Sequence, residues 1–135
     1  MIHPVILTVP EKLRRLRGRE KVRYLSAHAR RALRIACRKS GIEFRAPGKD
    51  GQGVPLPFGG FHWSVTHKPS YVGAVAASEP VGMDIEAFAS YSERLIRKIA
   101  DEHEWALDAD DPQRRFVRYW TAKEAVLKAV GTGMR

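Results

Sequence analysis

The stretch Trp-Thr-Ala-Lys-Glu-Ala-Val-Leu-Lys, residues 120–128, has the side-chain spacing of a helix with an unusual face. Residues three and four apart lie on one side of a helix. That side collects an aromatic, an aliphatic and three charged residues, namely Trp120, Lys123, Glu124, Leu127 and Lys128. An ordinary amphipathic helix separates apolar from charged residues. The charged groups therefore either extend from the edge of the core into water or line a binding site.

The second informative stretch is Gly-Met-Asp-Ile-Glu at residues 82–86. We expect a strand over residues 81–86, in which Asp84 and Glu86 point to the same side. Adjacent carboxylates repel each other unless a positive charge lies between them, and Mg²⁺ prefers oxygen ligands. Glu124 is a candidate third ligand, and Lys128 could neutralise a phosphate on the same metal. The alternative is a solvent-facing Asp-x-Glu at a strand end.

A third candidate site lies where the predicted strand over residues 61–66 ends and a turn begins. Thr66, His67 and Lys68 would place hydrogen-bond donors together at this junction, as a phosphate site requires. A lone histidine is also compatible with a purely structural role. A zinc site is not supported, because the spacing of the histidines is unsuitable and no cysteine accompanies them.

The remaining chain predicts an α+β fold, an antiparallel sheet packed on helices. From residue 89 the pattern turns helical, and Asp111 and Pro112 mark a helix start. The other expected elements are a strand over residues 2–9, a helix over 11–39 interrupted near Gly18, a loop over 46–60, a hairpin of residues 61–66 and 71–77, and a last helix over 112–130 that ends at Gly131.

Composition restricts the class of protein. The 135 residues suit one domain, and the formal net charge is +9. Twelve of the 24 Lys and Arg residues fall within residues 12–39, which indicates either a solvated helix face or a docking surface for an anionic partner such as nucleic acid, a phosphorylated cofactor or an acidic protein. The single Cys37 forms no intramolecular disulfide, so we expect a cytoplasmic location. Neither a signal peptide nor a membrane span is expected.

Three blocks of the sequence resemble the phosphopantetheinyl transferase superfamily, in particular its larger, Sfp-type branch. Residues 63–67, Trp-Ser-Val-Thr-His, are similar to the family's Phe-Asn-x-Ser-His. Residues 82–86 are similar to Gly-x-Asp-x-Glu. Residues 120–133 are similar to Trp-x-x-Lys-Glu-Ala-x-x-Lys followed by Gly-x-Gly. The blocks occur in the family's order, and the resemblance extends from about residue 25 to the C-terminus.

The resemblance implies transfer of 4′-phosphopantetheine from coenzyme A to a serine of a carrier protein, with release of 3′,5′-ADP. It implies that Asp84, Glu86 and Glu124 bind Mg²⁺ with the coenzyme A pyrophosphate, although Mn²⁺ remains an alternative. Glu124 would also be the base for the serine hydroxyl, and Lys128 would contact the pyrophosphate. The remaining residues expected to bind coenzyme A are Thr66 and His67 at the 3′-phosphate, Arg30 or Arg31 at the nucleotide end, and Lys123.

The family's fold consists of two pseudo-twofold α+β halves. We expect residues 1–80 to form the first half, and residues 81–135 to form a second half that is incomplete. If 135 residues are the whole natural chain, self-association should cover the last helix. The family's Gly-Lys-Pro loop is Gly53-Val54-Pro55 here, so Lys49 would have to supply the missing lysine. Glu104 matches a frequent family glutamate of unassigned role.

The expected partner is an acidic acyl, peptidyl or aryl carrier protein, docked on the basic residues 12–39. Three other interpretations stay open. A nucleic-acid-binding module is not favoured, because it leaves Asp84 and Glu124 unexplained. A metal nuclease would require a Glu-x-Lys element, but residue 126 is Val. A non-catalytic domain derived from the transferase fold would retain the architecture and lose turnover.

Overall fold

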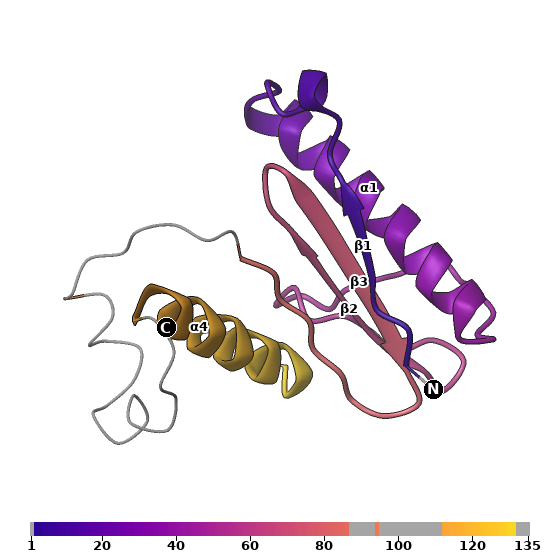
Figure 1. Ribbon diagram of the computed structural model, residues 1–135. Coiled ribbons are helices and arrows are strands. Elements are labelled where there is room, and N and C mark those ends of the chain that lie inside the picture. Colours follow the sequence, from indigo (N-terminus) through magenta and orange to yellow (C-terminus); the bar gives the residue numbers. More distant parts are fainter. Residues whose placement is uncertain (1, 87–93, 95–111, 132–135) are drawn as a thin grey trace.

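The computed structural model describes residues 2–86, 94 and 112–131, and it has an α+β architecture. The strands are β1 (Val5–Thr8), β2 (His62–His67) and β3 (Tyr71–Ala77). A short 3₁₀ helix, η1 (Glu11–Leu13), precedes the long helix α1 (Gly18–Lys39), and α4 (Pro112–Ala129) is the C-terminal helix. Figure 1 shows the sheet between α1 on one side and α4 on the other.

The sheet is antiparallel and has the strand order β1-β3-β2. The β2–β3 hairpin places Thr66 opposite Gly73, and its turn is closed by the Lys68 amide, which donates to the Tyr71 carbonyl at 2.8 Å. The strand expected over residues 2–9, the hairpin and the interruption of the first helix near Gly18 are confirmed. The loop expected over residues 46–60 is also confirmed, with isolated bridges that join Lys49 to Pro55 and Phe58 to Phe61.

The core lies between α1 and one face of the sheet. A stripe of small and aliphatic residues at helical spacing faces the strands, namely Leu25, Ala29, Ala32, Leu33, Ala36 and Cys37. It packs on Trp63, Val72, Ala74 and Ala76 of the sheet. His28 Nε2 donates to the Thr8 carbonyl at 2.8 Å and ties the helix to β1. Burial of this apolar surface is the main force that holds α1 on the sheet.

Strand β3 is buried on both faces, which explains its composition of small residues. Six of its seven residues, from Val72 to Ala77, are buried. At Gly73 the Met83 side chain packs directly on the strand, and an added Cβ would lie 2.7 Å from the Met83 methyl carbon, so that this side chain would have to shift. The chain after β3 can therefore pack directly on the sheet surface, opposite α1.

The expected strand over residues 81–86 is wrong, because the structure shows no strand there. Side chains, and not a neighbouring strand, bind the backbone of this segment. The Met83 amide donates to Ser64 Oγ at 3.1 Å, and the Met83 carbonyl accepts from Lys128 Nζ at 2.8 Å. The segment forms no ladder with the described sheet.

The last helix is confirmed, and it ends as expected before Gly131, which adopts a φ of +78°. The predicted cap at Asp111, the helical pattern after residue 89 and the position of Glu104 lie outside the described residues. The division into halves at residue 80, their pseudo-twofold relation and the incompleteness of the second half stay predictions. No helix within the described ranges combines the length and hydrophobicity needed to cross a bilayer.

Residue 82 determines how closely residues 81–86 approach α4. A Cβ on Gly82 would collide with the Ala125 carbonyl oxygen and would lie 2.6 Å from the Ala129 nitrogen. Both obstacles are helix backbone and cannot rotate away. The segment and the helix thus meet backbone to backbone at this glycine.

We expect Gly82→Ala to lower the free energy of unfolding by about 1–3 kcal/mol, because the added methyl group forces α4 away from residues 81–86. The control is Gly51→Ala, whose added Cβ has no heavy atom within 4 Å. That change should stay within about 0.5 kcal/mol of the parent chain. Urea denaturation measures both, and equal midpoints for the two variants would contradict the close contact.

Candidate functional site

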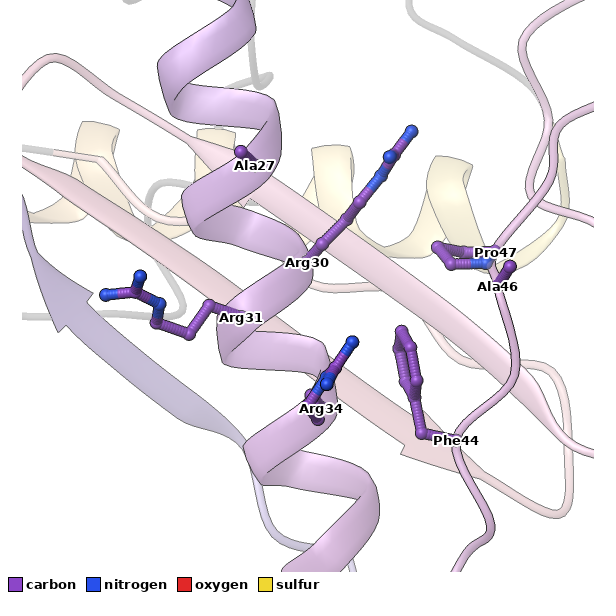
Figure 2. Close-up of a pocket in the computed structure, with 7 residues that line it drawn as sticks. All are labelled: Ala27, Arg30, Arg31, Arg34, Phe44, Ala46 and Pro47. Atoms are coloured by element: carbon purple, nitrogen blue, oxygen red, sulfur yellow. The ribbon is translucent and has the colours of Figure 1, made fainter.

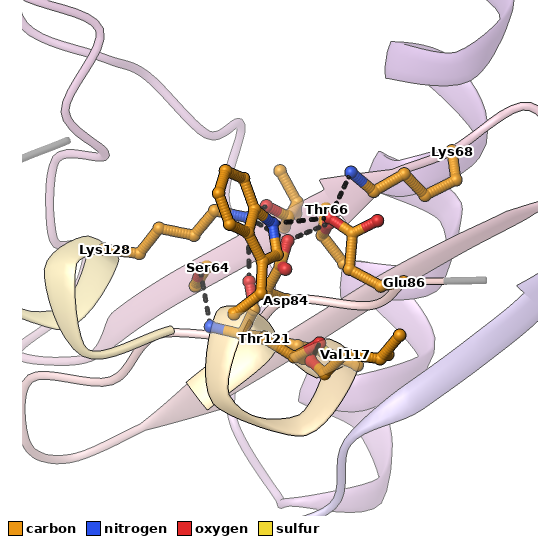
Figure 3. Close-up of polar contacts among 11 residues, drawn as sticks. Ser64, Thr66, Lys68, Asp84, Glu86, Val117, Thr121 and Lys128 are labelled. Atoms are coloured by element: carbon orange, nitrogen blue, oxygen red, sulfur yellow. Dashed lines mark hydrogen bonds and ion pairs between the residues drawn. The ribbon is translucent and has the colours of Figure 1, made fainter. Parts of the chain in front are cut away.

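Asp84 is buried where residues 81–86 pass between β2 and α4. Its Oδ1 accepts a hydrogen bond from Thr66 Oγ1 at 3.2 Å and an ion-pair contact from Lys128 Nζ at 3.4 Å (Figure 3). Only 5% of its side chain is exposed. Its other oxygen, Oδ2, is buried without a hydrogen-bond partner in the described part of the chain. A buried carboxylate oxygen is costly to leave unpaired, so Oδ2 is a natural ligand for a cation.

Glu86, two residues after Asp84 in the chain, is also bound through one of its oxygens. Its Oε1 receives Lys68 Nζ at 2.7 Å and Trp120 Nε1 at 3.0 Å. Lys68 belongs to the hairpin turn and its ammonium points toward Glu86 (Figure 3), while the indole is that of Trp120 in α4. Within the described part of the chain, each carboxylate is thus held through one oxygen, and Asp84 Oδ2 is left without a partner.

Lys128 connects the three parts of the site. Its ammonium donates to the Met83 carbonyl at 2.8 Å and to the Val65 carbonyl at 3.4 Å, in addition to Asp84 Oδ1. An ammonium has three hydrogens, so these contacts use its full donor capacity. The predicted site residues Thr66, Asp84 and Lys128 are thus brought together.

Lys68 lies in the combined field of all three predicted metal ligands. Desolvation acts to lower its pKa, but the hydrogen bond to Glu86 and the negative charges of Glu86, Asp84 and Glu124 outweigh it and raise the pKa of Lys68 above 10.5. The ammonium therefore stays charged across the physiological range, and together with Lys128 it balances these acids.

His67 follows Thr66 at the end of β2 and is exposed. Partial desolvation of the ring lowers its pKa below 6.5, and the positive charges of Lys49, Lys128 and Lys68 add to this effect. Trp63 Nε1 donates to the Leu56 carbonyl at 2.7 Å and holds the loop that carries Lys49 beside β2. The neighbourhood of His67 is thus strongly positive, which favours an anion.

Arg30 and Arg31 lie on a different surface from the carboxylates. They line a pocket of about 450 Å³ between α1 and the loop after it, together with Arg34 and Phe44 (Figure 2). The Arg34 guanidinium lies 4.8 Å from the centroid of the Phe44 ring, a cation–π contact. The structure therefore does not bring Arg30 or Arg31 to the Asp84 site.

The carboxylates border a second pocket of about 570 Å³. Asp84, Glu86 and Lys68 form its polar side, while Ile6 and Tyr71 of the sheet expose apolar surface toward it. A ligand in this pocket would have its charged group at the carboxylates and a less polar part over β1 and β3.

Among the described residues, no three Asp, Glu, His or Cys side chains are close enough together to form a metal site. Glu124 is half-buried on α4, and its charge reaches Lys68, but it does not join Asp84 and Glu86 in such a group. The donor chemistry nevertheless suits a hard divalent cation. Two carboxylates, one with an unpartnered buried oxygen, resemble the few protein ligands that Mg²⁺ takes while it keeps several waters.

Sequence reasoning missed Ser64, and it did not predict the partners of Lys68 and Trp120. Lys68 and Trp120 both bind Glu86, and Ser64 orients residues 81–86 through the Met83 amide. Alternation along β2 could have identified Ser64, because it shares a face with Thr66. The position of Lys68 in the turn after His67 was a signal for an anion site, but not for an ion pair with Glu86.

We expect the pKa of His67, followed by NMR titration, to lie below 6.5 and to rise toward 6.5 in Lys49→Met, because one repelling charge is lost. A lowered pKa means that the folded chain disfavours the charged ring. Its contribution to stability is therefore complete above pH 6.5 and is lost as the pH falls through the folded-state pKa. An unchanged pKa in Lys49→Met would show that Lys49 does not act on the ring.

Comparison with known proteins supports the resemblance that the motifs indicate. Residues 80–135 match the family model of the 4′-phosphopantetheinyl transferase superfamily. The 4′-phosphopantetheinyl transferase gsp of Aneurinibacillus migulanus is 28% identical over 90 residues, which cover 64% of this chain and 38% of that protein. The 4′-phosphopantetheinyl transferase psf-1 of Bacillus pumilus is 29% identical over 91 residues, covering 63% of this chain and 39% of that protein.

The 4′-phosphopantetheinyl transferase Sfp of Bacillus subtilis (strain 168) is 27% identical over 77 residues, which cover 54% of this chain and 34% of that protein. The matches thus span 34% to 39% of the relatives' own lengths. The match of residues 80–135, which include Asp84, Glu86 and the α4 motif, and the likeness to three Sfp-like proteins make the chain similar to the 4′-phosphopantetheinyl transferase superfamily, in particular to its Sfp-type branch.

Proposed function

We propose that this chain transfers the 4′-phosphopantetheine arm of coenzyme A to a serine hydroxyl of a carrier protein. The observation that carries the proposal is the pair of largely buried carboxylates, Asp84 and Glu86, each bound by a lysine through one oxygen. In a chain similar to this superfamily, such a pair suits a cation that binds a diphosphate. The named activity of the relatives agrees with this assignment.

Asp84 and Glu86 would hold the divalent cation, with Asp84 Oδ2 as the first ligand and Glu124 as a further oxygen donor. Mg²⁺ bound there would neutralise charge on the pyrophosphate oxygens and make the departing phosphate a better leaving group. Lys128 Nζ, fixed by the two backbone carbonyls, would add a positive charge that does not have to be reoriented during the reaction.

The transfer forms one bond and breaks another. The serine oxygen attacks the phosphorus that bears the pantetheine arm, and the bond from this phosphorus to the bridging oxygen breaks. The bridging oxygen leaves with 3′,5′-ADP. Glu124, half-buried on α4, would accept the serine proton directly or through water. General-base assistance of this kind is typically worth about 10²–10⁴-fold in rate.

The 3′-phosphate of coenzyme A would lie near His67 and Lys49. Both belong to the positive region at the end of β2, and Lys49 stands opposite Pro55 in the loop where the family's lysine is missing. Thr66 was expected to bind this phosphate as well. Its hydroxyl hydrogen is already donated to Asp84, so we assign Thr66 to the orientation of that carboxylate.

The remaining expected contacts concern the periphery of the site. Arg30 and Arg31, beside Phe44, offer a cationic and stacking surface, and the nucleotide end of coenzyme A would bind there only if it reached the α1 side. Lys123 lies on α4 next to Glu124 and would support binding of the cofactor. The basic residues 12–39 would dock an acidic acyl or peptidyl carrier protein in the cytoplasm.

The test is incubation of the chain with coenzyme A, Mg²⁺ and a panel of carrier proteins that lack the arm, followed by mass spectrometry. We expect the mass of a phosphopantetheine group on at least one carrier. Asp84→Asn and Glu124→Gln should reduce the rate by at least about 10²-fold, since each removes a charge that binds the cation or accepts the proton.

The matched control is Glu79→Gln, which neutralises an exposed carboxylate outside the pocket and should retain the full rate. Circular dichroism would verify that each variant is folded. A folded chain that modifies no carrier would refute the catalytic proposal. Near-parental rates for Asp84→Asn would refute the role of this carboxylate at the cation.

A further inference from the structure

We propose that Lys68 is a positioning residue that competes with the divalent cation for Glu86 and thereby makes metal binding depend on the diphosphate substrate. The inference rests on the proposed function, because it requires that a cation and a diphosphate share the Asp84 site. It concerns a residue of the hairpin turn, outside the three blocks that resemble the family.

The two lysines of the site differ in how firmly they are held. Lys128 uses all three ammonium hydrogens, two of them on backbone carbonyls, so it cannot leave without unpairing buried groups. Lys68 forms an ion pair with Glu86 at 2.7 Å, its one hydrogen-bonding partner among the described side chains. The two lysines are similarly exposed, at 34% and 31%, so the number of partners distinguishes them. Lys68 extends from a turn and can move into the adjacent pocket, which it also lines.

The position of the Lys68 ammonium is also the position that a divalent cation would favour. The negative charges of Glu86, Asp84 and Glu124 all act on this one ammonium. A second cation that binds the same carboxylates is repelled by the ammonium, and this repulsion is strong where water is partly excluded. The divalent cation must therefore displace Lys68 from Glu86.

Displacement leaves Lys68 without its ion-pair partner unless a new anion is present. A diphosphate bound to the cation supplies that anion within reach of the lysine stem. Binding of the cation alone therefore breaks the Lys68–Glu86 ion pair without replacing it. When a diphosphate binds with the cation, Lys68 forms an equivalent ion pair with the diphosphate. By linkage, the diphosphate must strengthen cation binding by the same factor by which the cation strengthens diphosphate binding.

Trp120 keeps Glu86 in place while Lys68 moves. Its indole Nε1 donates to the same oxygen, Oε1, at 3.0 Å and comes from α4, not from the turn. The carboxylate therefore retains one fixed hydrogen bond when the ion pair opens. The displaced element is then the lysine alone, and the carboxylate pair keeps its geometry.

The test measures binding, independently of turnover. The dissociation constant of Mn²⁺ is determined by electron paramagnetic resonance, without and with coenzyme A, for the parent chain and for Lys68→Met and Lys68→Arg. For Lys68→Met we expect Mn²⁺ alone to bind about 3–10-fold more tightly, and coenzyme A in the presence of Mn²⁺ to bind about 10-fold more weakly, within the usual range of coupling. Lys68→Arg should restore much of the coupling.

The control is Arg45→Met, which removes one positive charge from an exposed residue outside the carboxylate pocket. It should leave both dissociation constants unchanged, which separates the local effect from a change in net charge. A purely structural role of Lys68 would weaken both ligands together or change neither. Either result in Lys68→Met would overturn the inference while the parent chain still bound Mn²⁺ and coenzyme A.

A parent chain that binds neither Mn²⁺ nor coenzyme A would refute the proposed function together with this inference. A parent chain that binds both, but without mutual strengthening, would refute only the role of Lys68. Opposite shifts of the two dissociation constants in Lys68→Met are the result that supports it.

Discussion

The contact on which the rest of the site depends is the ammonium of Lys128 with its two backbone carbonyls and one carboxylate oxygen. This single group joins β2, residues 81–86 and α4, three parts of the chain that no ladder of backbone hydrogen bonds connects. Burial of polar backbone is tolerated only where partners are supplied, and here a charged side chain supplies them. The position of Asp84 therefore follows from α4 as much as from the segment that carries it.

Charge balance explains why the site has two lysines as well as two carboxylates. Asp84 and Glu86 are 5% and 15% exposed, and such acids are costly without nearby cations. Lys128 is held by three contacts, whereas Lys68 has one side-chain partner within residues 2–86, 94 and 112–131 and a flexible stem. In such a site the carboxylates keep their positions, while Lys68, one of the two balancing charges, can be exchanged for another cation.

The sequence predicted the elements with strong periodicity and missed those that depend on side chains. Helix α1, the hairpin and α4 follow from apolar spacing, with Gly131 as a stop signal. Residues 81–86 were expected to be a strand because alternation alone cannot reveal that Ser64 and Lys128 bind the Met83 backbone. The pairing of Thr66 with Asp84 fits the predicted proximity of these blocks. The pairing of Lys68 with Glu86 depends on the turn geometry, and the separation of Arg30 and Arg31 from the carboxylates depends on which face of the sheet α1 covers.

The backbone contact at Gly82 has a consequence for how this site can be studied and altered. Because the segment and the helix touch through main-chain atoms, the helix cannot slide along its axis or rotate when charged side chains are exchanged. The relative placement of the residue 84 and residue 124 side chains is thus set by steric fit, against the mutual repulsion of two acids. Charge substitutions in this pocket should consequently report on electrostatics, while the spacing of the acids can be changed only by enlarging residue 82 or its neighbours on the helix.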